Sequence, residues 1–217
     1  VGAFAMTGLC GLGVPWLLSL VGAMGATGLL AALIERRVLR PLVGRPVFVT
    51  IILTIFVGFL LRALVIIFWG TQPRGMPTPW DRTGTVNILG AQIYVNSLVL
   101  VGVGAAALGL FFAVIKYTKL GVAMRATAAD QETSLALGIP VGKIFAATWF
   151  LSGVYAALAG VFLSMEPRKV DINLGYVAMS AFPAVIVGGL DSPSGTVLAG
   201  LLLGVTQLLA QGYINPL

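Results

Sequence analysis

Long uncharged apolar runs recur along the chain and are separated by short polar segments. A bilayer core about 30 Å thick needs about 20 apolar residues of helix. Runs of that kind predict membrane spans over residues 16–34, 94–115 and 144–163. A run interrupted only by Arg62 predicts another span over 47–69, and residues 1–12 are expected to form part of a further apolar helix. The pattern therefore predicts an all-α, polytopic transmembrane helical bundle that forms one domain over the whole chain.

The last part of the chain has a different pattern. Residues 176–190 are apolar, but they would be only about 22 Å long as a helix. A break rich in Gly, Pro and Ser over residues 188–195 separates them from another apolar run, 196–210. Irregular backbone is tolerated at membrane depth only where protein or water satisfies its hydrogen bonds. We therefore predict a broken or re-entrant helix pair near the C-terminus.

Composition supports a membrane protein and excludes several chemistries. Charged residues are only 9% of the chain and the mean hydropathy is +1.03, whereas a soluble domain carries about 25% charged residues. The absence of histidine excludes His-based metal sites and Ser-His catalytic sites. The single cysteine, Cys10, excludes an internal disulfide. We expect no metal and no catalytic residue, and, because the chain is already apolar at Val1, we expect an internal fragment of a longer protein.

Basic residues in the loops predict the orientation in the membrane. Segments 35–46 and 116–143 hold four Lys or Arg residues each, whereas the loops after the 47–69 and 144–163 runs hold two each. Two spans separate the richer segments, so both lie on one face, and an excess of Lys and Arg marks the cytoplasmic side. These loops also account for the net charge of +6 without nucleic-acid binding.

The second cytoplasmic segment contains a short helix with signals at both ends. Thr127 and Asp130 form a pair similar to a capping box. Gly138 suits the left-handed position after a helix, and Pro140 prevents continuation. These signals predict a helix over residues 128–137. Such a helix, rich in Ala and Leu, either lies in the lipid interface or docks onto a cytosolic partner, and its periodicity alone does not decide between them.

Several motifs in this order resemble the permease subunit of branched-chain amino acid ABC importers, the Liv type. They are Glu35–Leu42, Phe68-Trp69-Gly70 before a Pro-rich loop, GxAMRATAADxExxxALGI over residues 121–139, LSGVYAALAGVFLS over 151–164 and AFPAVIVGGLDSPSGTVLAG over 181–200. In that family two permeases, identical or related, form a pore in the cytoplasmic (inner) membrane of bacteria and archaea. Two cytosolic ATPases drive it, and a periplasmic or lipid-anchored binding protein delivers substrate.

The resemblance implies how this chain would work. Residues 126–139 would be the coupling region seated in a groove of the ATPase. The implied contact residues are Arg125, Ala126, Ala128, Ala129, Asp130, Glu132, Ala136, Gly138 and Ile139. The segment departs from the EAA-type loop of other importers, because residues 128–130 have no glycine four positions on. Branched-chain amino acids are the implied cargo, although related permeases carry urea, amides or other amino acids.

The chain has no nucleotide site of its own. A Walker A loop has the pattern GxxxxGK[ST]. The nearest string, residues 138–144, has three residues between its glycines and ends in Ile. We therefore expect a transport subunit that is not an enzyme and binds no cofactor, with ATP and Mg on the partner ATPase.

Candidate residues for the translocation pathway each have a simpler structural interpretation. They are Arg62, Asn96, Gly188, Gly189, Ser194 and Gly195. Arg62 either contacts a substrate carboxylate or extends its charge to the membrane surface. Asn96 either lines the pathway or forms an interhelical hydrogen bond. The Gly and Ser residues flank helix ends that either meet a zwitterion or form a tight packed turn.

Two other classes of protein remain as alternatives. An ion-coupled secondary transporter needs acidic residues inside the membrane, yet all seven acids lie in loops, at span edges or at the break. A non-transporting membrane scaffold is the other alternative. An aspartyl protease is excluded, because the residues before Asp191 do not form GxGD. The outer segments 72–80 and 166–169 are either solvated loops or contacts for a binding protein.

Overall fold

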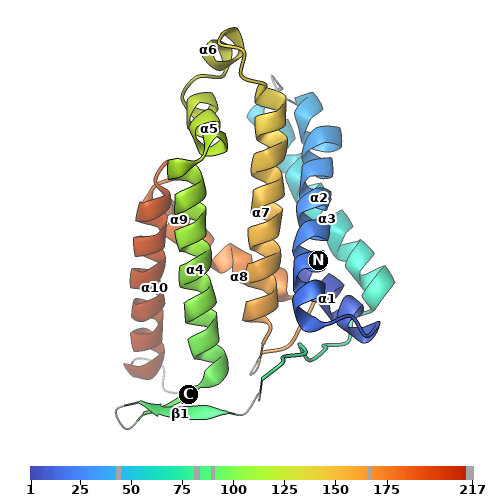
Figure 1. Ribbon diagram of the computed structural model, residues 1–217, viewed down its shortest axis with the longest axis vertical. Coiled ribbons are helices and arrows are strands. Elements are labelled where there is room, and N and C mark those ends of the chain that lie inside the picture. Colours follow the sequence, from blue (N-terminus) through green and yellow to red (C-terminus); the bar gives the residue numbers. More distant parts are fainter. Residues whose placement is uncertain (43–44, 81–83, 89–90, 166–167, 214–217) are drawn as a thin grey trace. The chain divides into compact units, whose positions relative to one another are not determined.

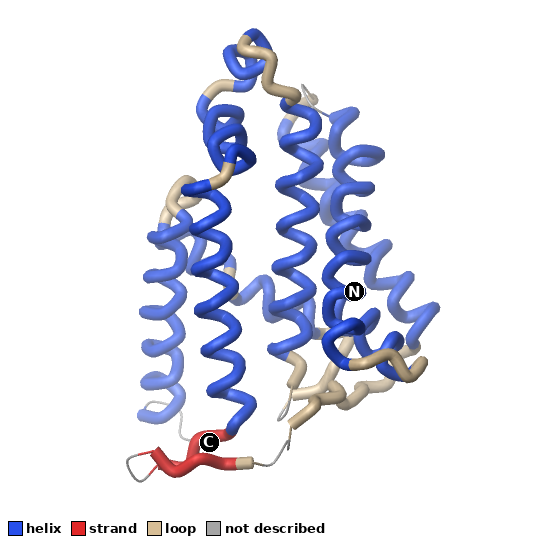
Figure 2. Tube along the Cα trace, in the orientation of Figure 1, coloured by secondary structure: helices blue, strands red, loops and turns tan. Residues whose placement is uncertain are grey.

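The chain folds almost entirely into helices (Figures 1 and 2). The computed structural model describes residues 1–42, 45–80, 84–88, 91–165 and 168–213. Its helices are α1 (Gly2–Gly11), α2 (Trp16–Ile34), α3 (Val47–Trp69), α4 (Val95–Tyr117), α5 (Lys119–Ala129), α6 (Gln131–Ala136), α7 (Val141–Leu163), α8 (Leu174–Ser180), α9 (Phe182–Gly188) and α10 (Pro193–Tyr213). A π-helical turn, η1 (Glu35–Leu39), and a 3-10 turn, η2 (Arg40–Leu42), follow α2.

Five helices of the described chain are long and apolar enough to cross a membrane: α2, α3, α4, α7 and α10. The all-α polytopic fold class is therefore confirmed. Helices α4 and α7 extend beyond the apolar runs that predicted them, 94–115 and 144–163, since α4 continues to Tyr117 and α7 begins at Val141. The reason is that Lys116 and Lys143 end an uncharged run without ending a helix, because lysine is a good helix former.

A short antiparallel hairpin, which the hydropathy pattern did not predict, precedes α4. Strand β1 (Thr85–Ile88) pairs with β2 (Ala91–Tyr94), with Thr85 opposite Tyr94 and Asn87 opposite Gln92. Strands of four residues are too short to stand out against apolar helices in a hydropathy profile. Their Thr, Val, Ile and Tyr residues do favour extended backbone.

The residues after 172 also differ from the expected pair of short helices. The apolar run 176–190 forms two helices, α8 and α9, which meet at Ala181. Pro183 explains the interruption, because it has no amide hydrogen to donate to the preceding turn. The following helix, α10, is longer than the predicted run 196–210, since it begins at Pro193 and continues for 21 residues.

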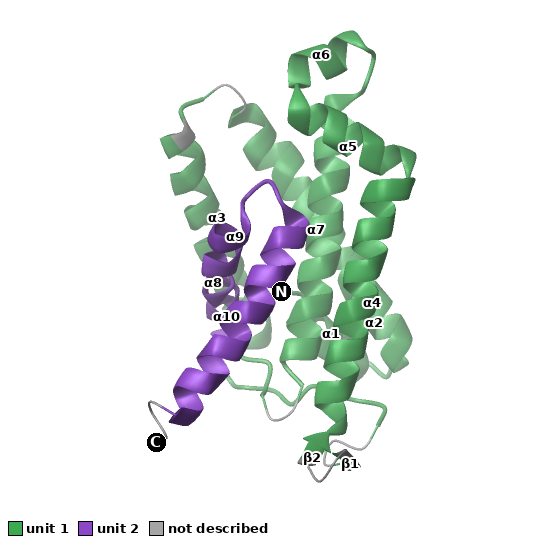
Figure 3. Ribbon diagram, turned by 90° about the vertical axis from the view of Figure 1, so that its left-hand side faces the viewer, with its two compact units in different colours: residues 1–172 green, residues 173–217 purple. Residues whose placement is uncertain are grey.

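The described chain groups into two compact units, residues 1–172 and 173–217 (Figure 3). In the first unit, α2 and α7 pack at a crossing of small residues. A Cβ added at Gly153 would lie 2.7 Å from the Thr27 carbonyl oxygen and 2.9 Å from Gly28 Cα. Glycine is thus required for this close approach of two backbones, as is common where helices associate in lipid.

The two ends of the first unit carry different loops. Residues 35–42 and the α4–α7 connection lie at the same end, where the Arg40 side chain reaches Gly142. At the opposite end, Arg74 and Val170 form an antiparallel backbone bridge. The loops therefore alternate between the ends as the span count predicts. A single domain over residues 1–217 stays a prediction.

Candidate functional site

The segment between α4 and α7 is built from two helices rather than the single helix predicted over 128–137. Thr118 caps α5, since its hydroxyl oxygen accepts a hydrogen bond of 3.1 Å from the Gly121 amide. Gly121 allows the first turn of α5 to pack closely against the last turn of α4, because an added Cβ would lie 2.5 Å from Ile115 Cα. The Arg125 guanidinium then donates to the Ile115 carbonyl oxygen. These contacts fix α5 directly to the end of α4.

Asp130 divides the two helices. Its backbone is extended, with φ −157° and ψ 114°, and its carboxylate accepts hydrogen bonds from the amides of Glu132 (2.9 Å) and Thr133 (3.1 Å). Asp130 is therefore the N-cap of α6. The predicted capping pair of Thr127 and Asp130 is wrong, because Thr127 is buried inside α5. An Asp side chain competes for amides that a continuous helix would use, and this competition explains the interruption.

The predicted end of this segment is confirmed. Gly138 has φ +81°, its amide donates to the Leu135 carbonyl at 3.0 Å, and the Ile139 amide donates to the Ser134 carbonyl at 3.0 Å. This pair of bonds is a Schellman motif, which satisfies the last carbonyl groups of α6. Helix α6 is therefore capped at both ends and forms the tip of the first unit, beyond the ends of α4 and α7 (Figure 1).

The electrostatics of α6 are set by its cap. The side-chain hydrogen bond from Thr133 is the largest cause that lowers the pKa of Asp130 below its ordinary value of 3.8, followed by the backbone bond from Thr133. The carboxylate is thus negative at neutral pH and lies at the positive end of the helix, where negative charge is favoured. Glu132 adds a second acid in the first turn.

Helix α6 and its two cap residues, Asp130 and Leu137, expose apolar as well as acidic side chains. Leu135 and Leu137 are 59% and 76% exposed, whereas Ser134 is buried. Two exposed leucines beside two acids make a surface that suits a protein groove with apolar and basic lining.

All of the predicted coupling residues are accessible on this segment. The exposed ones are Arg125, Ala128, Ala129, Asp130, Glu132, Ala136 and Gly138, and the half-buried ones are Ala126 and Ile139. The structure thus brings them together on α5, α6 and the turn that follows. Their contact with an ATPase stays a prediction.

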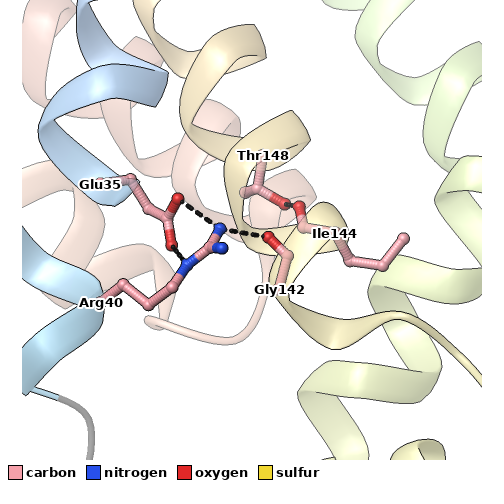
Figure 4. Close-up of polar contacts among 5 residues, drawn as sticks. All are labelled: Glu35, Arg40, Gly142, Ile144 and Thr148. Atoms are coloured by element: carbon pink, nitrogen blue, oxygen red, sulfur yellow. Dashed lines mark hydrogen bonds and ion pairs between the residues drawn. The ribbon is translucent and has the colours of Figure 1, made fainter. Parts of the chain in front are cut away.

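A side-chain cluster that sequence reasoning missed lies beside this segment (Figure 4). Arg40 donates from Nε and Nη2 to the Glu35 carboxylate at 3.0 and 2.9 Å. The same Nη2 donates to the Gly142 carbonyl oxygen at 2.5 Å. Residues five apart do not share a face of an α-helix, so the spacing of Glu35 and Arg40 gave no signal before the π-helical turn was known.

Asn96 takes part in a network at the opposite end of the unit. The Trp80 indole donates to Asn96 Oδ1 at 2.6 Å, and the Trp16 indole donates to the Pro77 carbonyl at 2.9 Å. The two indole rings pack edge to face, with centroids 5.5 Å apart. Asn96 is 5% exposed, and Trp80, which donates to it, lies in the loop before the hairpin. A pathway role for Asn96 stays a prediction.

The remaining candidates are not gathered into one site. Arg62 is half-buried in α3, and its pathway role stays a prediction. Arg168 and Lys169 follow residues 166–167, which lie outside the described residues. The predicted docking of these outer segments to a binding protein also stays a prediction.

The break in the second unit forms a tight turn. Gly189 has φ +92°, and a Cβ added at Gly195 would lie 3.1 Å from the Gly188 carbonyl carbon. The Gly195 amide donates to Ser192 Oγ at 3.1 Å, so Ser192 caps α10 ahead of Pro193. Ser194 is exposed. This geometry favours the packed-turn interpretation over an open substrate site.

The helices and loops described above define a multi-pass α-helical membrane protein with a capped helix displayed at one end. Comparison with known proteins identifies its family. The family model described as branched-chain amino acid transport system / permease component matches residues 1–216, and the chain belongs to this family.

Individual relatives are similar over most of the chain. The high-affinity branched-chain amino acid transport system permease protein LivH of Salmonella typhimurium is 28% identical over 214 residues, which cover 95% of this chain and 70% of that protein. LivH of Escherichia coli K12 is 28% identical over 215 residues, with the same shares. The corresponding protein BraD of Pseudomonas aeruginosa is 31% identical over 208 residues, which cover 94% and 67%. No solved structure matches the chain significantly.

Proposed function

We propose that this chain is the permease subunit of an ABC importer, and that it carries branched-chain or other small amino acids across the cytoplasmic membrane. Family membership supports the transport role and argues against a scaffold. The names of LivH and BraD support branched-chain amino acids as the cargo.

The observation that carries the mechanism is the display of α6 at the tip of the first unit. A short helix that is capped at both ends, with Leu135 and Leu137 exposed beside Asp130 and Glu132, forms an ordered surface that no described part of the chain covers. We propose that a cytosolic ATPase covers it, through residues 126–139. Because α6 is already ordered before the ATPase binds, docking loses little conformational entropy. Movement of the ATPase is then passed directly to the permease.

In this mechanism the ATPase hydrolyses ATP with Mg, and this chain binds neither. ATP binding brings two ATPases together and displaces α6. The bundle then opens to the other side of the membrane. Such coupling requires that α6 contact the ATPase differently in the two states.

The further partners follow from the same family. A second permease, identical or related, completes the pore, and a binding protein in the periplasm or on a lipid anchor delivers substrate to the outer end. Among the predicted pathway residues, Asn96 lies at that outer end, where the Trp80 indole fixes its side-chain oxygen.

Uptake by reconstituted vesicles tests the proposal. The complete permease is purified with its ATPase and binding protein, and ATP hydrolysis and leucine uptake are measured in parallel. We expect the ATPase to co-purify, and uptake to require ATP. Replacement of exposed Ala129 by Trp should abolish uptake without preventing membrane insertion, because the large ring disturbs the docking surface.

The matched control is Thr71→Trp, at an exposed position at the opposite end of the unit. It should leave ATP-driven uptake unchanged. Uptake driven by a proton or sodium gradient without ATP would contradict the proposal and favour a secondary transporter.

A further inference from the structure

We propose that Glu35, Arg40 and Gly142 form a clamp that makes the end of α2 move with α6, so that Glu35 and Arg40 are positioning residues for energy coupling. The inference rests on the proposed function, in which α6 is the element that the ATPase displaces. It concerns a different question, namely how displacement of α6 reaches the membrane spans.

The π-helical turn η1 creates the pairing of Glu35 with Arg40. In a regular α-helix, residues five apart are separated by about 140° around the axis, so their side chains diverge. Here the Arg40 amide donates to the Glu35 carbonyl, as it does in a π-helix, and the side chains of the same two residues form the ion pair. Single π-helical turns of this kind occur frequently at functional sites.

The burial of Glu35 makes this ion pair more than a surface contact. Glu35 is 3% exposed, and a buried carboxylate is costly unless it is paired and hydrogen-bonded. The planar guanidinium of Arg40 places two donors on the carboxylate at once. A lysine ammonium is a single point charge and lacks this fork.

The third member of the clamp joins a different helix. Arg40 Nη2 also donates to the carbonyl oxygen of Gly142, in the first turn of α7. Glycine at 142 leaves the guanidinium uncrowded, because an added Cβ would lie 3.3 Å from Arg40 Nη1 and 3.4 Å from Cζ, so that Arg40 would have to shift by a few tenths of an ångström. One side chain thus ties the end of α2 to the start of α7.

The connection from α6 to this clamp is short and stiff. Three residues separate Gly138 from Gly142, and Pro140 fixes one backbone angle among them. The Ile139 amide is bonded back to Ser134 of α6, and the Ile144 amide is bonded to the Pro140 carbonyl. Val141 and Ile144 are buried. When α6 is displaced, Gly142 therefore moves with it, because the connecting residues have little freedom to move separately.

Helices α2 and α7 are already packed closely along their lengths at Gly28 and Gly153. The clamp joins them at the end nearest α6, where force would enter. With the clamp intact, α2 and α7 move as one body. With it broken, α6 displaces the first turn of α7 alone, and ATP is hydrolysed without transport.

The test compares variants of the complete permease, reconstituted with its ATPase and binding protein. Arg40→Gln removes the clamp, and Arg37→Gln is the matched control, since Arg37 is an exposed arginine in the same turn. The quantities measured are membrane abundance, ATPase co-purification and leucine uptake per ATP hydrolysed. We expect Arg40→Gln to lower uptake per ATP at least about five-fold, while the ATPase still co-purifies and Arg37→Gln matches the wild type.

A second comparison separates coupling from folding. The exchange Glu35→Arg with Arg40→Glu restores opposite charges, but a carboxylate at position 40 cannot donate to the Gly142 carbonyl. Arg40→Lys also keeps the buried carboxylate compensated while losing the fork. We expect both to reach normal membrane abundance and to remain uncoupled, and, should Arg40→Gln fail to accumulate, these two variants decide the question.

Normal uptake per ATP in Arg40→Gln, or in the charge exchange, whose carboxylate at position 40 has no donor for Gly142, overturns the clamp while leaving the proposed function intact. Failure of the wild-type permease to retain an ATPase overturns the proposed function instead. A reduction shared equally by Arg37→Gln overturns the clamp as well, because it assigns the effect to loop charge.

Discussion

Thr133 binds Asp130 twice: its hydroxyl donates to Asp130 Oδ2 at 2.5 Å, and its amide donates to Asp130 Oδ1 at 3.1 Å. This pair fixes the first turn of α6. It also gives Asp130 two roles that variants can separate, since the side chain caps the helix and carries a negative charge toward the proposed ATPase.

Substitutions of Asp130 separate capping from charge. Asn is as good an N-cap as Asp, so Asp130→Asn keeps the cap and loses only the charge. We expect Asp130→Asn to retain at least about half of the wild-type uptake per ATP, and Asp130→Ala to retain less than Asp130→Asn because the cap is lost as well.

Charge reversal at Asp130 and Glu132 together should uncouple hydrolysis from uptake. Equal uptake in wild type and the reversed variant, measured in vesicles, would count against the contact.

The pH dependence of the cap follows from the lowered pKa of Asp130. Hydrogen bonds from Thr133 lower the pKa below 3.8, so the cap stabilises α6 at pH above the unfolded pKa and is lost as pH falls through the lower, folded value. Titration of Asp130 therefore leaves coupling unchanged between pH about 5 and about 8. The measurement is the uptake ratio of Asp130→Asn to wild type across that range, and a ratio that changes with pH would contradict this assignment.

The exposed leucines of α6 and its C-cap should matter for binding the ATPase. Leu135→Ser with Leu137→Ser removes the apolar part of the surface and should lower co-purification of the ATPase at least about ten-fold, since burying one leucine side chain is worth about 1.5–3 kcal/mol. Leu12→Ser is the control, because Leu12 is 80% exposed and lies outside this segment. Equal loss in both variants would show that exposed leucines act through solubility rather than docking.

The crossing of α2 and α7 should not tolerate a methyl group. An added Cβ at Gly153 would lie 2.7 Å from a backbone oxygen and 2.8 Å from Ala31 Cβ. We expect Gly153→Ala to destabilise the protein by about 1–3 kcal/mol, as overpacking does. Gly104→Ala is the matched control in α4, where nothing lies within 4 Å. Thermal unfolding in detergent compares the two, and equal midpoints would show that the crossing is not tight.

The two serines at the break of the second unit should behave differently. Ser192 accepts from the Gly195 amide and caps α10, so Ser192→Ala should cost about 1 kcal/mol of stability. The side-chain contact described for Ser194 is a long one, 3.4 Å from its Oγ to Ser192 Oγ. Ser194→Ala should therefore leave the stability unchanged. If Ser194 touches substrate, its removal raises the KM for uptake instead, and leucine uptake kinetics distinguish these results.

Much of the fold could be predicted because the bilayer imposes a length on apolar helices. Apolar runs placed α2 and α3, the latter despite Arg62, and the signal of Gly138 before Pro140 placed the end of α6. Helix boundaries were less accurate where lysines continue a helix, as at Lys116. The break within 176–190 was missed because Pro183 lies among strongly apolar residues, and hydropathy is insensitive to a missing amide hydrogen.

The candidate site was only partly predictable for a related reason. The sequence predicted which residues of the coupling segment are accessible. It assigned the N-cap to Thr127 instead of Asp130, because either side chain can accept hydrogen bonds from nearby amides. The link from Arg40 to Gly142 joins residues 102 apart. No local pattern records such a contact, and the π-helical turn that produces it has no simple signature in sequence.

Cross-linking from α6 to the ATPase tests the central claim most directly. Replacing Cys10 by Ser leaves no cysteine among these 217 residues, and a single cysteine can then be placed at the exposed Ala136 of α6 or at Thr71, at the opposite end of the unit. With a photoactivatable thiol reagent in native membranes, we predict an ATPase adduct from Ala136→Cys and none from Thr71→Cys. Labelling of Ala136→Cys only from the outer side of the membrane, or the absence of any ATPase adduct from it, would contradict the account.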